Sequence, residues 1–407
     1  MIRKTFLPFL LIVLAIGAAP SRAIQTTSRP AATAPITIPF ELVVRHIMVK
    51  VRINNSRPLS FVLDTGDQVG IVDIEVAKEL GLKLQGEVHI GGAGSGTLPG
   101  SMVQNATWTL PGLDGFSQPI RLAIPLARME ARFGHDFDGI IGAEFIKQFV
   151  VEVDYPGRVI RLHDKNQFSY SGSGESIPVQ LDGQGHPILE AEVTPLAGEP
   201  IKGQFVLDLG AAGALALMTP FVVEHRLLNS EIKTIKAIGM GGAGGQSSGR
   251  IGRVAELKIG KYKIANPTTI FSEDKAGAFA TSALAGNIGQ QIASRFKLFL
   301  DYDHSRIVFE PAAAFSQSFD RAHSGLALAA EGRDYKVFRI TDVLENSPAS
   351  EAGLQKEDLI IQVNDQTAGE LTLTKLGELF EKSVPYKMTV KRGDQTLQVT
   401  LTPRKLV

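Results

Sequence analysis

The sequence predicts a mainly β protein with two related lobes, followed by a smaller α+β domain. Three observations support this fold class. Glycine is frequent, with 41 residues, and the apolar segments are short, as in β-proteins with many turns. Phe-Val-Leu-Asp-Thr-Gly at 61–66 returns as Phe-Val-Leu-Asp-Leu-Gly at 205–210. After residue 322, strand-like segments alternate with helical ones, which indicates a third unit of a different type.

The expected domain boundaries follow changes in composition along the chain. Two segments without strand or helix periodicity are interpreted as linkers. The predicted division is a signal peptide at 1–23, a disordered leader at 24–35, a first lobe at 36–163, a linker at 164–176, a second lobe at 177–310, a linker at 311–322 and a C-terminal domain at 323–407.

The first residues are typical of an export signal. Arg3 and Lys4 precede an apolar run at 6–16, and Ser-Arg-Ala at 21–23 offers a small-residue cleavage site. The run is too short to span a bilayer comfortably, so we expect cleavage after Ala23 and no stable membrane insertion. The chain has no cysteine, which excludes disulfides and thiol catalysis. These features predict an exported protein of a bacterial envelope, periplasmic or extracellular.

The charge of the chain is balanced, with 42 basic and 42 acidic residues. This balance gives no indication of a nucleic-acid partner or of an anionic membrane surface. The eight histidines form no H-E-x-x-H motif and no close pair, so we expect no metal site and no cofactor. His46 and His186 occupy equivalent places in the repeat and are interpreted as structural.

The repeat extends well beyond the two hexapeptides. From Asp64 to Gly142 is 78 positions, and from Asp208 to Gly289 is 81. Both glycines end a short apolar segment that precedes a predicted helix. Glycine-rich segments begin 27 and 31 positions after the two aspartates. A long period seen twice predicts two paired lobes rather than a solenoid.

The glycine-rich segments, 91–96 and 239–249, are predicted to form mobile hairpin tips. Residues 239–244 also fit G-x-G-x-x-G, but no helix follows, as a dinucleotide site requires. Residues 245–249 fit G-x-S-x-G, but Ser247 lacks the strand-to-helix setting of a nucleophile elbow. The predicted tip residues are Gly91, Gly92, Gly94, Gly241, Gly242 and Gly244.

Two carboxylates at the ends of equivalent strands are the strongest chemical signal. If the strands meet across a pseudo-twofold axis, Asp64 and Asp208 lie within hydrogen-bond reach and share one proton. The ionised member can then deprotonate a water while the neutral member hydrogen-bonds a carbonyl. Gly66 and Gly210 follow and let the backbone approach closely. Asp154 and Asp301, at matching turns, are the rival acid pair.

This set of motifs resembles the aspartic peptidases, and in particular the bacterial retropepsin-like branch with both lobes on one chain. The resemblance covers residues 36–310 and occurs in each half. It implies catalysis of peptide-bond hydrolysis by Asp64 and Asp208, flaps over the cleft, and a polypeptide substrate. It also implies that Thr65, Gly66, Leu209 and Gly210 form the active-site loops.

The sequence departs from the family pattern at two positions. The family has a threonine after each aspartate, and its hydroxyl bonds to the backbone of the other lobe; Thr65 fits, whereas Leu209 cannot make that bond. We therefore expect a loosened pair, by about 1–3 kcal/mol for an unmade buried bond. Asp67 adds a third carboxylate where a small residue is usual. The alternative function is a catalytically impaired, peptide-binding envelope protein of the same fold.

The C-terminal domain resembles a PDZ domain of the kind found in bacterial envelope proteases. The residues that carry this resemblance are Ser-Pro-Ala at 347–349, Ala-Gly-Leu at 352–354, Asp-Leu-Ile at 358–360 and Asn364. It implies that Gly325, Leu326 and Ala327 bind a peptide C-terminus, which adds as an extra strand. A module that only packs against the lobes is the alternative.

Overall fold

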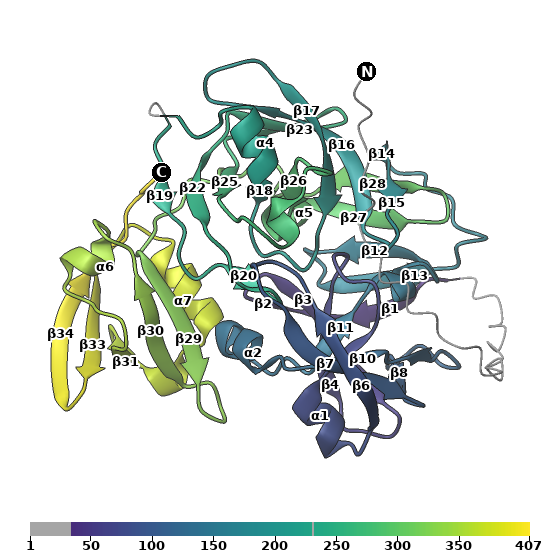
Figure 1. The fold of residues 1–407 in the computed structure, drawn as a ribbon, viewed down its shortest axis with the longest axis horizontal. Coiled ribbons are helices and arrows are strands. Elements are labelled where there is room, and N and C mark those ends of the chain that lie inside the picture. The colour runs from purple at the N-terminus through teal and green to yellow at the C-terminus, as the bar shows by residue number, and fades with distance from the viewer. Residues whose placement is uncertain (1–33, 230–231) are drawn as a thin grey trace, which may run out of the picture.

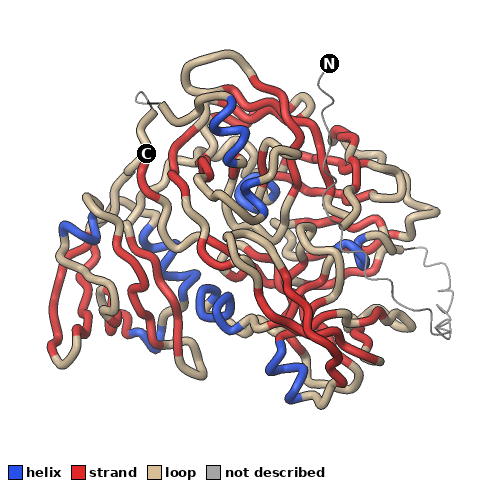
Figure 2. The backbone as a smooth tube through the Cα atoms, viewed as in Figure 1, coloured by secondary structure: helices blue, strands red, loops and turns tan. Residues whose placement is uncertain are grey.

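The computed structural model describes residues 34–229 and 232–407. Two β-rich lobes lie against each other, and a smaller domain at the C-terminal end of the chain packs beside them (Figure 1). Strands dominate all three units and the helices are short (Figure 2). The prediction of a mainly β chain with an α+β C-terminal domain is confirmed. The predicted signal peptide at 1–23 and residues 24–33 of the predicted leader lie outside the described residues.

The first lobe consists of short strands and three short helices. Its helices are α1 (Ile74–Glu79), α2 (Ala127–Phe133) and α3 (Ala143–Ile146). Its strands are β1 (Ile36–Pro39), β2 (Glu41–Val43), β3 (His46–Ile53), β4 (Leu59–Leu63), β5 (Ile71–Asp73), β6 (Lys83–Ile90), β7 (Leu98–Gln104), β8 (Thr107–Thr109), β9 (Gln118–Pro119), β10 (Leu122–Ile124), β11 (Gly139–Ile141), β12 (Val150–Asp154) and β13 (Val159–His163).

The second lobe has a similar order of elements. Its helices are α4 (Thr219–Glu224), the 3₁₀ turn η1 (Ala278–Ala280) and α5 (Gln290–Ala293). Its strands are β14 (Glu175–Pro178), β15 (Gln180–Leu181), β16 (Pro187–Thr194), β17 (Ile201–Leu207), β18 (Leu215–Leu217), β19 (Ile235–Lys236), β20 (Gly241–Gly242), β21 (Gly245–Gln246), β22 (Gly249–Arg253), β23 (Glu256–Ile259), β24 (Tyr262–Ala265), β25 (Thr268–Ser272), β26 (Gly286–Ile288), β27 (Phe296–Asp301) and β28 (Arg306–Pro311).

The pairing of the central strands repeats between the lobes. In the first lobe β11 runs parallel to β4 and antiparallel to β5. In the second lobe β26 runs parallel to β17 and antiparallel to β18. The strands β4 and β17, which carry the repeated hexapeptides, therefore hold equivalent places in two related sheets. This shared topology supports a duplication within the chain.

A six-stranded sheet joins the lobes, in the order β1-β13-β12-β27-β28-β14. Its two central strands, β12 and β27, pair across the lobe boundary, with Val151 opposite Leu300 and Val153 opposite Leu298. These four side chains are fully buried in one hydrophobic cluster that extends through both lobes. Burial of this apolar surface fixes one lobe on the other.

The C-terminal domain is an α+β unit with its own core. It contains β29 (Leu326–Glu331), β30 (Val337–Val343), α6 (Pro348–Glu351), β31 (Leu359–Val363), β32 (Gln366–Thr367), η2 (Ala368–Glu370), α7 (Leu373–Phe380), β33 (Tyr386–Arg392) and β34 (Gln395–Leu401). The sheet order β29-β30-β31-β33-β34 leaves β29 at one edge. In the described ranges, no helix has the length and apolar character needed to cross a bilayer.

The C-terminal domain is docked onto the first lobe through α2. This helix lies against both β29 and α7 (Figure 1). At its end a Cβ on Gly134 would lie 3.0 Å from both Ala330 and Leu373. The Tyr335 hydroxyl donates a hydrogen bond of 2.7 Å to Glu130 Oε1 of α2. Helix α2 of the first lobe thus packs against both β29 and α7 of the C-terminal domain.

Candidate active site

The two hexapeptides place Asp64 and Asp208 at equivalent points. All five residues of β4 are buried, and the last three residues of β17 are buried, so each strand ends inside the protein. The Asp64 N–H donates to the Ile141 carbonyl and the Asp208 N–H to the Ile288 carbonyl, each at 2.9 Å. The neighbouring strands β11 and β26 thus hold both aspartates in the same way.

The structure brings the carboxyl groups of Asp64 and Asp208 to one point, since a Cβ on Gly66 would lie within 3.1 Å of an oxygen of each. The Gly66 N–H donates to Asp64 Oδ1 at 2.6 Å, and the Gly210 N–H donates to Asp208 Oδ1 at 2.8 Å. Space requires glycine at 210, where a Cβ would lie 1.9 Å from Asp64 Oδ2, and a Cβ on Gly66 would be in tight contact with Asp208 Oδ1 at 3.0 Å.

The environment of Asp64 favours its protonated form. Burial raises the pKa of Asp64 well above the ordinary value, because desolvation penalises the charge. The negative charges of Asp208 and then Asp67 raise the pKa of Asp64 further. Two carboxylates in contact cannot both ionise at low cost, so the pair holds one proton over a wide pH range.

Thr65 makes the cross-lobe brace expected from the resemblance. Its hydroxyl donates to the Leu207 carbonyl at 2.6 Å and accepts from the Leu209 N–H at 2.9 Å. Both bonds are buried and reach from one lobe into the catalytic loop of the other. Thr65 therefore fixes the two loops relative to each other.

The expectation that Leu209 leaves the brace half-made needs correction. The Gln290 side chain donates from Nε2 to the Leu209 carbonyl at 2.7 Å and accepts from the Tyr155 hydroxyl at 2.6 Å. This second buried connection also joins the lobes, while the Leu209 side chain packs in the core. In the first lobe, the residue equivalent to Gln290 is Ala143, which follows Gly142 as Gln290 follows Gly289. Only the second lobe therefore has a glutamine that replaces the missing threonine bonds.

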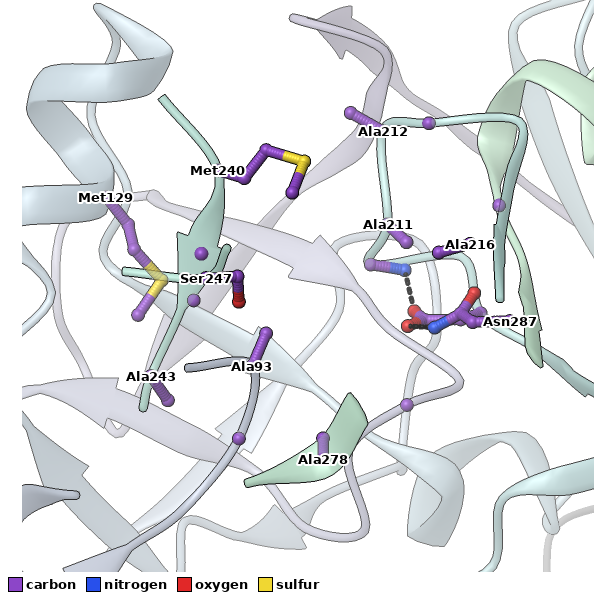
Figure 3. A pocket seen from close by; sticks show the side chains of 18 of the residues that line it. Ala93, Met129, Ala211, Ala212, Ala216, Met240, Ala243, Ser247, Ala278 and Asn287 are labelled. Atoms are coloured by element: carbon purple, nitrogen blue, oxygen red, sulfur yellow. Dashed lines mark hydrogen bonds between the residues drawn. The ribbon is translucent and has the colours of Figure 1, made fainter. Parts of the chain in front are cut away.

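Asn287 gives Asp208 a hydrogen-bond donor that Asp64 lacks. Its Nδ2 lies 2.5 Å from Asp208 Oδ2, at the site where Figure 3 draws the bond beside Ala211 and Ala216. Asp208 therefore accepts from two donors of the second lobe. The equivalent residue of β11 is Ile140, which carries no donor.

Asp67 and His186 lie beside the pair and line the same cavity. Burial, followed by the charge of Asp208, raises the pKa of Asp67 to about 6. His186 opposes this effect, and its Nδ1 lies 2.8 Å from Asp182 Oδ2. The third carboxylate thus faces the pair, as its position in the sequence suggested, and it titrates in mildly acidic solution.

The glycine-rich tips meet above the acid pair. Residues 91–97 connect β6 to β7, and β20 pairs with β21 in the second lobe. The Gly96 N–H donates to the Gly244 carbonyl at 2.7 Å, and the Gly242 N–H to the Ala93 carbonyl at 3.2 Å. A Cβ on Gly94 would lie 2.5 Å from the Gly244 carbonyl oxygen, so the close approach requires glycine there.

A cavity of about 1360 Å³ extends from the acid pair beneath these tips. Asp64, Gly66, Asp208 and Gly210 line it, together with the predicted tip glycines Gly91, Gly92, Gly241 and Gly242. Figure 3 shows Ala93 and Ala243 of the tips on one side and Asn287 on the other. The cavity is mostly lined by small and apolar side chains, which suits an extended polypeptide.

The cavity reaches the C-terminal domain, where Leu326 and Ala327 of β29 line it. Gly325 precedes them with a φ of 82°, and a Cβ there would lie 2.2 Å from Ser347 Oγ. The Leu326 N–H donates to Ser324 Oγ at 3.2 Å. The predicted peptide-binding residues therefore lie beside the wall of the catalytic cavity, next to helix α2.

Other candidates from the sequence lie elsewhere or are used otherwise. His46 is buried, which lowers its pKa, and its Nε2 lies 3.0 Å from the Gly210 carbonyl, so it supports a catalytic loop. Asp154 accepts from the Gly157 N–H, and Asp301 is fully buried against Arg306. Neither aspartate lines the cavity.

Ser247, the serine of the G-x-S-x-G match, lies in the cavity wall (Figure 3). Among the described residues, its buried hydroxyl has no hydrogen-bond partner, so no base contacts it. Its strand β21 leads into a further strand and not into a helix. The arrangement does not provide a serine nucleophile.

Two functional residues, Asn287 and Gln290, were not identified from the sequence. Both lie next to the repeated Gly289, where the second lobe differs from the first. A residue-by-residue comparison of the two halves would have drawn attention to polar residues replacing Ile140 and Ala143.

Comparison with known families agrees with this geometry. Residues 49–145 match the family described as aspartyl protease, and residues 339–391 match the PDZ domain family. The chain therefore carries an aspartyl protease domain and a C-terminal PDZ domain.

Individual relatives also match only part of the chain. Serine protease HTRA1 of Xenopus laevis is 30% identical over 67 residues, which are 16% of this chain and 14% of that protein. A crystal structure of the HtrA3 PDZ domain bound to a phage-derived ligand is 21% identical, covers 21% of this chain and 86% of that one, and gives a TM-score of 0.19. The photosystem II D1 C-terminal processing protease is 20% identical, covers 23% and 26%, and gives 0.21.

Proposed function

We propose that the protein is an aspartic endopeptidase that uses a water molecule to hydrolyse peptide bonds. The observation that carries this proposal is that the carboxyl groups of Asp64 and Asp208 meet at one point in a cavity beneath paired flaps. Such a pair supplies a base and an acid at one point without metal or covalent intermediate. The aspartyl protease domain at 49–145 supports the same class of reaction.

The donors around the pair assign a role to each aspartate. Asp208 accepts from the Gly210 N–H and from Asn287 Nδ2, so it is the ionised member and deprotonates the water. Asp64, whose pKa is raised, keeps the shared proton and donates it to the substrate carbonyl oxygen. Attack of the hydroxide oxygen on the carbonyl carbon forms a tetrahedral diol. Its collapse breaks the C–N bond as the proton held by Asp208 moves to the leaving nitrogen.

We further propose that the PDZ domain binds peptide termini close to the catalytic cavity. Leu326 and Ala327 of β29 line that cavity, and β29 is an edge strand with one side open to pairing within its sheet. Helix α2 packs against β29 and α7, so a peptide that adds to β29 meets the first lobe as well. PDZ binding and substrate entry therefore share one region of the surface.

Export to a bacterial envelope remains part of the proposal, on the basis of residues 1–23. N-terminal sequencing of the protein from fractionated cells tests it. A mature chain beginning at residue 24 in the envelope fraction is the expected result, whereas an intact N-terminus in the cytoplasm contradicts it.

The test of catalysis compares the purified chain with Asp64→Asn and Asp208→Asn. An unbiased peptide mixture is incubated between pH 3 and pH 8, and new termini are identified by mass spectrometry. Cleavage by the parent chain and its loss in both variants is expected. Asp154→Asn is the matched control, because its carboxylate lies outside the cavity lining, where it accepts from the Gly157 N–H and from Arg161, and it should cleave normally.

The catalytically impaired, peptide-binding alternative makes a different prediction in the same experiment. It requires that no peptide is cleaved at any pH, while peptides still bind to the full chain. Cleavage that persists in both aspartate variants would show that another group carries the reaction.

A further inference from the structure

Two guanidinium groups line the catalytic cavity without carboxylate partners. Arg128 and Arg132 lie one turn apart on α2, and both face the cavity. Arg132 Nη1 donates to the Gly241 carbonyl of the second flap at 3.2 Å. Within residues 34–229 and 232–407, neither arginine has a carboxylate within 4.0 Å.

Several partly buried arginines elsewhere in the protein pair with carboxylates, whereas the buried Arg295 donates to backbone carbonyls and lies over the Phe319 ring. Arg161 pairs with Glu152, Arg306 with the buried Asp301, and Arg392 with the buried Asp358. These pairs are the usual way in which a protein accommodates a cation with reduced access to water. Arg128 is exposed and Arg132 half-buried, and both guanidinium groups line the cavity, where a ligand can reach them.

The arrangement on α2 is also unfavourable in the free protein. Burial lowers the pKa of Arg132, and the charge of Arg128 lowers it further. Like charges one turn apart destabilise a helix. An anion that enters between the two side chains relieves both effects, and the planar fork of arginine matches the two oxygens of a carboxylate.

The position of α2 in the cavity fixes which part of a ligand it meets. Figure 3 shows Met129 of α2 across the cavity from Asn287, which contacts the acid pair. Asp64, Asp67 and Asp208 make the opposite side negative, so an anionic group is repelled there. The cavity is thus polarised from the acid pair towards α2.

We propose that Arg128 and Arg132 bind a carboxylate of the polypeptide substrate and thereby set its direction through the cavity. This inference deepens the proposed endopeptidase function and rests on the same cavity. The carboxylate comes either from an acidic side chain some residues away from the cleaved bond or from the C-terminus of the substrate. Both sources present the same two oxygens to the two guanidinium groups.

The first experiment measures binding and does not depend on cleavage. The full chain carrying Asp64→Asn is titrated with a fluorescent peptide in four forms, with glutamate or glutamine near one end and with a free or amidated C-terminus. We expect the form with the recognised carboxylate to bind about tenfold more tightly than its amide, which corresponds to one good charge-assisted bond. A difference between the glutamate and glutamine forms identifies a side-chain carboxylate, and a difference between the free and amidated forms identifies the C-terminus.

The same titration with arginine variants tests the assignment. Arg128→Gln combined with Arg132→Gln should abolish the tenfold preference and leave the amide forms unchanged, and Arg132→Lys should keep part of it. Arg121→Gln is the control, because this exposed arginine lies outside the cavity lining. Equal affinity of acid and amide forms for the parent, or an equal loss for all four peptides in the double variant, would overturn the proposal.

Kinetics separate this inference from the proposed function. If the unmodified chain cleaves neutral, amidated peptides as fast as acidic ones, catalysis stands and the carboxylate site is wrong. If no peptide is cleaved but the binding preference is present and needs the arginines, the site stands and the hydrolytic function is wrong. Where both stand, the double variant should raise KM for acidic peptides about tenfold and leave kcat within twofold.

Discussion

Asn287 Nδ2 lies 2.5 Å from Asp208 Oδ2, and this contact makes a duplicated site chemically asymmetric. The partner aspartate, Asp64, faces Ile140 at the equivalent position and receives no such bond. In a homodimeric arrangement both aspartates would have identical surroundings. Here, the fused chain can assign the charge to one member by a single residue.

Asn287→Leu should move the acidic limb of the pH–rate profile upwards by about one pH unit. A hydrogen bond to a charged acceptor contributes about 1.5–3 kcal/mol, and its loss makes the ionised form of the pair harder to reach. The profile of kcat/KM between pH 3 and pH 8 measures the shift. Ile140→Val, at the equivalent place, should leave the profile unchanged, and an unshifted limb in Asn287→Leu would contradict the role of this amide.

Tyr155→Phe should destabilise the protein by about 1–2 kcal/mol, whereas Tyr302→Phe should not. The Tyr155 hydroxyl donates to Gln290, which in turn holds the Leu209 carbonyl. The Tyr302 hydroxyl, at the equivalent position, is buried without a partner among the described residues, so its removal costs little. Urea unfolding of both variants provides the comparison, and equal effects would refute the second brace.

Asp67→Asn should stabilise the protein at pH 7 and have little effect at pH 3.5. The pKa of Asp67 is raised to about 6, so the folded state binds more protons than the unfolded state between pH 4 and pH 6. Stability therefore falls as pH rises through this window, and the amide removes a penalty on the order of 1–3 kcal/mol.

Asp182→Asn provides a control of opposite sign for the Asp67 measurement. Burial opposes ionisation of Asp182, but the N–H groups of His186 and Gln184 outweigh it and lower its pKa. This variant should lose stability at pH 7 and approach the parent as pH falls below 4. The free energy of unfolding of both variants, measured at several pH values, tests these opposite pH dependences. If the two variants depend on pH in the same way, the pKa directions assigned to Asp67 and Asp182 are contradicted.

Gly134→Ala should loosen the contact between the first lobe and the PDZ domain. The residue has a φ of 59°, and its Cβ would lie 3.0 Å from Ala330 and Leu373. Hydrogen exchange should accelerate in β29 and α7. Gly81→Ala is the matched control, since its φ is 64° and nothing lies within 4 Å of an added Cβ. The same exchange pattern in both variants would show that only backbone strain matters.

The architecture was predictable because the residues that repeat between the two halves of the chain are residues of the hydrophobic core. The buried strands 61–63 and 205–207 and the glycines behind Asp64 and Asp208 have equivalents in each half, so their place in the fold could be inferred. The family comparisons and the observed secondary structure agree with that inference for the fold class.

The finer features of the candidate site could not be predicted from the sequence. The bond from the Tyr155 hydroxyl to Gln290 joins residues 135 positions apart in different lobes and depends on how the two lobes pack. Helix α2 was not expected, because its sequence carries no capping side chain and it is stabilised by packing against β29 and α7. The sequence therefore predicted the catalytic floor of the cavity but not the wall formed by this helix.

The bonds between the two glycine-rich tips have a kinetic consequence. A long chain with structure on both sides of the scissile bond can reach the aspartates only when Gly96 and Gly244 separate, and it leaves in the same way. A short peptide with a free end can instead thread beneath the closed tips. Under the proposed function, turnover on long chains is therefore gated by the frequency of tip separation, while turnover on short peptides is governed by the chemistry at the acid pair.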